Sequence, residues 1–94
     1  LTVLLPAAER AGAVLVPQCR ADVIEREGGR VAGVRAVVGG DGQAPSVVTV
    51  RAKTVVLAAG AVASPQLWLR SGLPDPHRQV GRHLHLHPQV IVQA

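Results

Sequence analysis

Alternating apolar and polar positions predict three β-strands in the middle of the chain. Residues Cys19 to Glu27 mix apolar and polar side chains as a half-buried strand does, and Arg30 to Val38 follows as a return strand. Between them, Gly28-Gly29 is a two-residue hairpin signal, and Gly33 is a candidate β-bulge. A third strand is expected over Val47 to Lys53, after a glycine-rich loop. The pattern therefore predicts a three-stranded β-meander.

Further elements are predicted on both sides of this meander. Good helix formers over Thr2 to Ala11 predict a helix that ends at Gly12. Residues Thr54 to Ala59 are continuously apolar, as in a strand that is covered on both faces in a parallel sheet. A short helix is expected from about Ser64 to Arg70, and renewed alternation predicts a last strand from Leu84 to Gln93.

The stretch from Val55 to Pro74 (VVLAAGAVASPQLWLRSGLP) joins an apolar strand to four small residues and then to a helix. The small residues, Ala58 to Ala61, leave room for the backbone to approach a bound cofactor closely. Ser64-Pro65 suits a helix start with a serine cap, and Gly72 suits a helix end. Such a turn also occurs where only helix–strand packing requires it, so both interpretations stand at this point.

Composition and charge restrict the class of protein. The 94 residues allow at most one small domain, and the 48% of hydrophobic residues include one aromatic side chain, Trp68. A core of Val, Leu and Ala in so short a chain is expected to be marginally stable alone, so we interpret the chain as a piece of a larger domain. The net charge of +4 comes from scattered basic residues without interleaved aromatic rings, which argues against nucleic acid as a partner.

Other residues exclude or limit further classes. The single Cys19 cannot form a disulfide within the chain, and no apolar run approaches the ~20 residues that span a bilayer. We therefore expect a soluble protein without a membrane-spanning segment. The compartment stays open at this point, with the cytoplasm favoured.

The residues from Gly60 to Leu73 resemble the second signature of the glucose-methanol-choline (GMC) oxidoreductase family. That signature contains a small residue, Ser-Pro or Thr-Pro, paired aliphatics and Ser-Gly-aliphatic. Here it corresponds to Gly60-Ala61, Ser64-Pro65 and Ser71-Gly72-Leu73, with Trp68 where an aliphatic residue is usual.

The resemblance extends to both sides of the signature. Upstream, Cys19-Arg20-Ala21 follows the order of the family in register. Downstream, Val80 to Leu84 (VGRHL) resembles its Val-Gly-Arg-Asn-Leu element, with His83 in place of Asn. The run from Leu84 to Pro88 (LHLHP) is similar to the long-chain fatty alcohol oxidase branch.

The resemblance implies an α/β fold that is part of an FAD/NAD(P)-binding (Rossmann-like) domain with an inserted three-stranded β-meander. We expect residues 1–94 to be a single fragment of that domain. Its expected parts are 1–18 (helix and strand), 19–53 (β-meander), 54–73 (strand–turn–helix signature) and 74–94 (connector and strand).

The resemblance also implies an FAD-dependent enzyme that oxidises the CH–OH group of a small-molecule alcohol by hydride transfer to the flavin. By its position in the family, Ala21 offers backbone N–H and C=O groups to the adenine, and Ala59 and Gly60 lie where the chain passes the adenosine part of FAD. The chain has no GxGxxG fingerprint, and the catalytic His of the family matches no residue here. We therefore expect cofactor contacts at Ala21, Ala59 and Gly60 and no catalytic residue. Another flavoprotein with two dinucleotide folds and a non-enzymatic β-rich binding module are the alternatives.

Three histidines, His83, His85 and His87, alternate near the end of the chain. On a strand they share one face, where two could bind one metal ion. Neighbours on that face stand about 6.6 Å apart, so three are not expected to converge on one ion. We expect no metal site, and one or two imidazoles that make buried hydrogen bonds near the flavin or substrate cavity.

Overall fold

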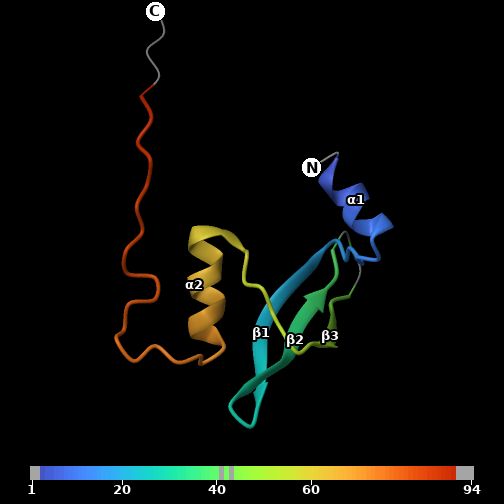
Figure 1. Ribbon diagram of the computed structural model, residues 1–94, viewed down its shortest axis with the longest axis horizontal. Coiled ribbons are helices and arrows are strands. Elements are labelled where there is room, and N and C mark those ends of the chain that lie inside the picture. Colours follow the sequence, from blue (N-terminus) through green and yellow to red (C-terminus); the bar gives the residue numbers. More distant parts are fainter. Residues whose placement is uncertain (1–2, 41, 43, 91–94) are drawn as a thin grey trace, which may run out of the picture.

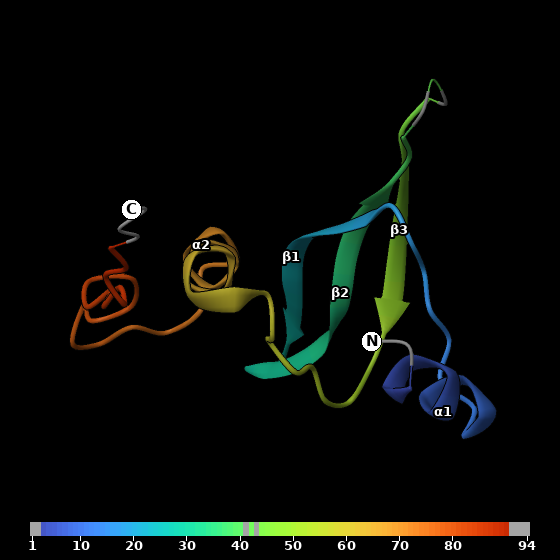
Figure 2. The same ribbon diagram turned by 90° about the horizontal axis from the view of Figure 1, so that it is seen from above.

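The computed structural model describes residues 3–40, 42 and 44–90 of the chain (Figure 1). Two helices and three strands follow one another as α1 (Leu4–Arg10), β1 (Cys19–Glu27), β2 (Arg30–Val38), β3 (Ser46–Arg51) and α2 (Gly60–Arg70). In both views α2 lies beside β1, while α1 lies toward the β3 side of the sheet (Figures 1 and 2). Of these elements, α2 contacts the sheet through β1, and α1 contacts none of the others.

The three strands form the expected meander, an antiparallel sheet in the order β1-β2-β3. The turn between β1 and β2 consists of Gly28 and Gly29, whose φ angles are 55° and 80°. Two consecutive positive φ angles define the type I′ turn, whose twist matches that of the flanking strands. The hairpin predicted from the Gly-Gly pair is therefore confirmed.

The ladder between β1 and β2 contains two β-bulges. One leaves Ala32 outside the register, so the bulge expected at Gly33 lies one residue before it. The other leaves Asp22 outside the register, between Ala21 and Val23. A bulge bends its strand and increases the local twist, and the second bulge lies in the part of β1 that faces α2.

Gly33 has a role that the sequence did not show. A Cβ atom at this position would lie 2.2 Å from the carbonyl oxygen of Val50 and 3.0 Å from the Cα of Arg51. Both atoms belong to the backbone of β3, which cannot move away without breaking the β2–β3 ladder. Glycine is therefore required here for close approach of two strands.

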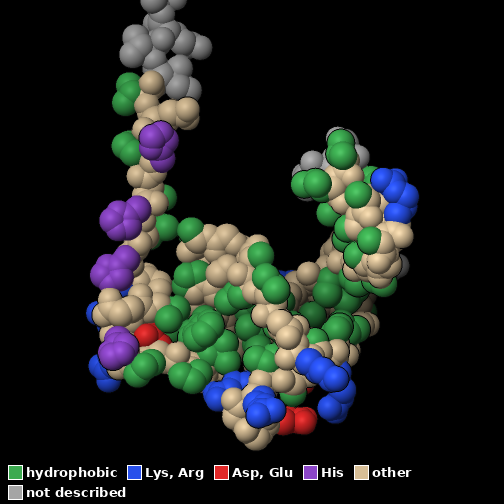
Figure 3. All heavy atoms as spheres, viewed as in Figure 1, with side chains coloured by type: hydrophobic (Ala, Val, Ile, Leu, Met, Phe, Trp, Pro, Cys, Tyr) green, Lys and Arg blue, Asp and Glu red, His purple; other side chains and the backbone are tan. Residues whose placement is uncertain are grey.

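Few apolar side chains are buried in the described part of the chain. The buried hydrophobic residues are Ile24 and Ala36, each 4% exposed, and Leu67, 8% exposed. In contrast, Val56 and Leu86 are 83% and 78% exposed, and hydrophobic side chains cover much of the surface in Figure 3. The radius of gyration is 17.1 Å, against about 12 Å for a compact domain of this length. That the chain is a piece of a larger domain stays a prediction, and this exposure supports it.

Three expected strands are not strands of a sheet in the described residues. The strand expected within residues 1–18 and the strands expected over 54–59 and 84–90 pair with no other strand there. Residues 91–94 of the last expected strand lie outside the described range. The apolar run of Thr54 to Ala59 is typical of a strand that is covered on both faces in a parallel sheet. The three strands of the meander pair only with one another, so they offer this run no partner.

Substitution of Gly33 tests the close approach of β2 and β3. We expect Gly33→Ala to destabilise the protein by about 1–3 kcal/mol, because the added methyl overlaps fixed backbone atoms. The measurement is the midpoint of thermal or urea unfolding of the full-length gene product. Gly28→Asn is the control, since φ is 55° and no heavy atom lies within 4 Å of its Cβ, and asparagine tolerates this backbone conformation. A Gly33→Ala protein as stable as the wild type would contradict the argument.

Candidate functional site

A groove of about 470 Å³ lies between β1 and α2. Its β1 side consists of residues 19–21, and its α2 side includes Ala59, Ala63 and Arg70. We call it the β1–α2 groove. It brings together Ala21 and Ala59, which are 38 positions apart in the sequence and were both expected to contact a cofactor.

The residues on the α2 side of the groove follow the period of the helix. Ala59, Ala63 and Leu67 are spaced by four positions, so they lie on one face of α2. Leu67 is buried, whereas Ala59 and Ala63 are exposed and small. The face therefore packs on β1 at its C-terminal half and leaves open space at its N-terminal half.

The helix begins four residues earlier than expected, at Gly60 instead of Ser64. Ser64 is thus not the N-cap. Its hydroxyl accepts a hydrogen bond of 3.0 Å from the backbone N–H of Ala59, the residue that does occupy the N-cap position. Because alanine joins a helix at low cost, the small residues before Ser64 extend the helix, and Pro65 lies inside it.

Gly60 is next to the groove but does not line it. Its φ is 85°, and a Cβ atom there would meet no heavy atom within 4 Å. Glycine is therefore needed for the backbone conformation at the start of α2, where an L-residue would be strained. Of the three residues expected to contact a cofactor, the structure places two on one groove and the third beside them.

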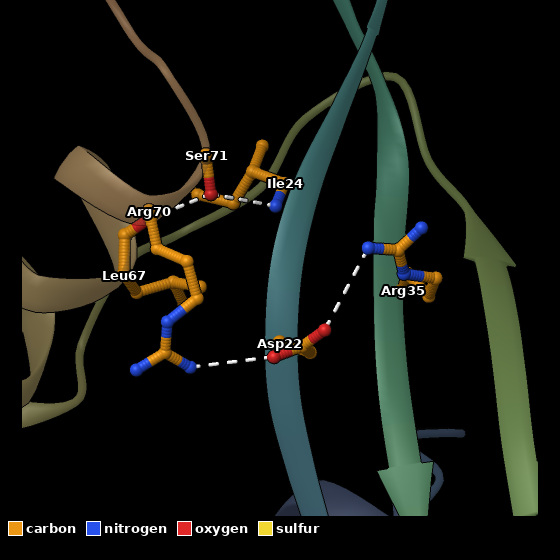
Figure 4. Close-up of polar contacts among 6 residues, drawn as sticks. All are labelled: Asp22, Ile24, Arg35, Leu67, Arg70 and Ser71. Carbon is orange, nitrogen blue, oxygen red and sulfur yellow. Dashed lines mark hydrogen bonds and ion pairs between the residues drawn. The ribbon is translucent and has the colours of Figure 1, made fainter.

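Polar contacts at the C-terminal end of α2 join the helix to β1 (Figure 4). The Ser71 hydroxyl accepts a hydrogen bond of 2.8 Å from the Ile24 N–H and donates one of 2.6 Å to the Leu67 carbonyl oxygen. Asp22 lies 3.3 Å from the Arg70 guanidinium and 3.6 Å from that of Arg35. Together these contacts connect α2, β1 and β2.

Sequence reasoning missed both of these contacts. Ser71 is part of the Ser71-Gly72-Leu73 element of the family signature, and Asp22 is not among the residues that the sequence pattern singles out. One signal was present for Ser71, which continues the four-residue spacing of Ala63 and Leu67 and so belongs to the face toward β1. Nothing in the sequence indicated Asp22, because its position depends on a bulge.

The histidines of the last segment make no buried hydrogen bond among the described residues. His83, His85 and His87 are all exposed, and histidine side chains line the outer side of the segment after α2 in Figure 3. The His83 Nε2 atom lies 2.5 Å from the Gln79 side-chain oxygen, at an exposed position. His83 and His85 line a pocket together with Ala61 and Pro65 of α2, and the expectation of buried hydrogen bonds near the flavin or substrate cavity stays a prediction.

Within residues 3–40, 42 and 44–90, no group of three or more His, Cys, Asp or Glu side chains is placed to hold a metal ion. In the same part of the chain, neither helix has the length and apolar character needed to cross a bilayer.

Comparison with known proteins identifies the family. The family model of the GMC oxidoreductases matches residues 1–89, so the chain belongs to the GMC oxidoreductase family. This family is in general flavin-binding. The match confirms the resemblance that Gly60 to Leu73 indicated.

Curated relatives agree with this assignment. An uncharacterised GMC-type oxidoreductase of Mycobacterium tuberculosis is 41% identical over 90 residues, which are 94% of this chain and 13% of the relative. A long-chain-alcohol oxidase of Arabidopsis thaliana is 33% identical over 88 residues, 85% of this chain and 12% of the relative. An uncharacterised GMC-type oxidoreductase of Sinorhizobium fredii is 37% identical over 91 residues, 97% of this chain and 17% of the relative. The chain thus spans less than a fifth of the length of these relatives, and no solved structure matches it.

Substitution of Gly60 tests the conformational role of that residue. We expect Gly60→Ala to destabilise the protein by about 1–2 kcal/mol, the cost of a left-handed conformation in an L-residue, since there is no steric overlap to add. The unfolding midpoint of the full-length gene product reports the change. Gly60→Asn should destabilise the protein less than Gly60→Ala, because asparagine adopts the left-handed conformation more readily. If both variants are as stable as the wild type, the positive φ at this position is wrong.

Proposed function

We propose that this chain forms part of the adenosine-binding wall of an FAD-dependent oxidoreductase. One observation carries the proposal: Ala21 and Ala59, selected for cofactor contact from the resemblance alone, line the same groove. Gly60 follows directly at the start of α2 and completes the proposed set of contacts.

The chemistry of the groove fits an adenosine group. Its volume of about 470 Å³ lies within the range of small-molecule sites. β1 is an edge strand, so one row of its backbone donors and acceptors is not used by the sheet. The bond from the Ile24 N–H to Ser71 shows that this row faces α2. Adenine offers both a donor and acceptors along its edge, which suits recognition by backbone groups of a small residue such as Ala21.

The charge of the groove also fits a dinucleotide. Arg20 and Arg70 both line it, and none of the acidic side chains that the structure describes does. Arginine is well suited to phosphate groups, so the positive charge is compatible with the diphosphate of FAD. Asp22, the nearby carboxylate, is engaged by two guanidinium groups.

In the intact enzyme, FAD would supply the hydride acceptor, and the protein would supply binding and orientation. The residues of this chain would hold the adenosine end: β1 through its backbone, and α2 through a face of small side chains. We assign no proton transfer to them. The apolar run of Thr54 to Ala59 would complete a parallel, Rossmann-like sheet with strands of the longer protein, and the four-part division of residues 1–94 belongs to the same proposal.

We propose a small-molecule alcohol with a large apolar part as the substrate. The support is the relative named long-chain-alcohol oxidase, together with the LHLHP run of residues 84–88. The family match over residues 1–89 favours a GMC enzyme over another flavoprotein with two dinucleotide folds and over a β-rich binding module.

The absorption spectrum of the purified full-length gene product tests the class. We expect flavin bands with a flavin content close to one per protein, and release of FAD, rather than FMN, on denaturation. A well-folded product that is colourless and binds no added FAD would refute the proposal.

A substitution that fills the groove tests the site. We expect Ala63→Phe to weaken FAD binding by the full-length apoprotein about tenfold or more, because an aromatic ring occupies space that the adenosine needs. Fluorescence quenching of FAD on binding gives the affinity. Ala7→Phe, on the exposed helix α1 away from the groove, is the control and should bind as the wild type does. Equal affinities for Ala63→Phe and Ala7→Phe would place the cofactor elsewhere.

A further inference from the structure

We propose that Ser71 is a positioning residue that sets the width of the β1–α2 groove and thereby the affinity for the adenosine half of the cofactor. The proposal rests on the proposed function, and it assigns to Ser71 a task beyond ending the helix. Ser71 does not line the groove, so its effect must pass through the placement of α2.

The Ser71 hydroxyl takes part in two hydrogen bonds. It accepts from the N–H of Ile24 at 2.8 Å and donates to the carbonyl oxygen of Leu67 at 2.6 Å. Ile24 is only 4% exposed, so water cannot readily replace the hydroxyl as acceptor. A buried N–H without an acceptor is costly in free energy. Movement of the last turn of α2 away from β1 would leave the Ile24 N–H in that state, so the hydrogen bond keeps the two elements together.

A row of residues along one face of α2 connects Ser71 with the groove. Ala63, Leu67 and Ser71 are spaced by four, so Ser71 lies about 12 Å along the helix axis from Ala63. Leu67 packs between them and is buried. The C-terminal end of α2 is thus tied to β1, and the N-terminal end carries the small residues of the groove. A tilt of α2 about its C-terminal contact with β1 therefore changes the distance between the β1 wall and the α2 wall of the groove.

An ion pair lies beside the Ser71 hydrogen bonds. Arg70, one residue before Ser71, lies 3.3 Å from Asp22, which also lies 3.6 Å from Arg35 of β2. Exposed ion pairs contribute little individually, and these side chains are 32% to 49% exposed. The Arg70–Asp22 pair therefore supports the orientation of α2 that the Ser71 hydrogen bonds define. Its loss should weaken ligand binding less than the loss of those hydrogen bonds does.

The test measures two ligands on the full-length apoprotein. We expect Ser71→Ala to raise the dissociation constant of FAD and the inhibition constant of AMP, which competes for the adenosine site, by the same factor of about ten. Ser71→Thr keeps the hydroxyl and should restore both constants. Ser46→Ala, an exposed serine at the start of β3, is the matched control and should leave both unchanged.

The alternatives give different results. A purely structural role lowers the melting temperature of the Ser71→Ala protein and leaves both constants unchanged, and this overturns the proposal. Weaker FAD binding with an unchanged AMP constant overturns it as well. If Ser71→Ala does not fold, Asp22→Asn takes its place, with an expected increase of about two- to fivefold in both constants, and unchanged constants then overturn the proposal. A wild-type protein that binds neither ligand refutes the proposed function and this inference with it.

Discussion

The contact between α2 and the free edge of β1 is the constraint on which the candidate site depends. β1 pairs with β2 along one edge only, and α2 contacts β1, where the Ser71 hydroxyl accepts a hydrogen bond from the Ile24 N–H. The burial of Leu67 supplies the apolar part of this contact, and the Ser71 hydroxyl satisfies a backbone donor that the sheet leaves free. Without this contact the helix and the sheet have no shared surface, and the groove between them has no second wall.

The same contact explains why the site is made of small residues and backbone. An edge strand offers N–H and C=O groups whose positions are defined by its own ladder, so recognition through them requires no large side chain. The opposite wall then has to leave space, which alanine at positions 59 and 63 does. The positive φ of Gly60 turns the chain into α2 at this point. A ligand with a flat edge of donors and acceptors suits such a wall, and adenine, the group we propose for the groove, has such an edge.

The large exposed apolar surface has a related physical meaning. Only a small core is buried in the described residues, around Ile24, Ala36 and Leu67, while the apolar run before α2 and the segment after it pair with no strand there. Burial of apolar surface is the main favourable term in folding, so side chains of this kind are expected to be covered in the functional protein. The much greater length of the curated relatives is in accord with a longer chain that covers them.

The sequence by itself determined the local features of this protein. The alternation of apolar and polar residues and the Gly28-Gly29 pair were enough to predict the meander and its hairpin. Side-chain periodicity and backbone φ preferences act over a few residues, so a local pattern carries this information. The small residues at positions 58–61 and the Ser-Pro to Ser-Gly spacing were enough for the family. Only the tertiary structure decided what depends on distant segments: the hydrogen bond between Ile24 and Ser71, 47 positions apart, the position of Asp22 at a bulge, and the need for glycine at position 33. These result from how α2 and β3 pack on their neighbouring strands, and no local pattern encodes the separation of two elements in space.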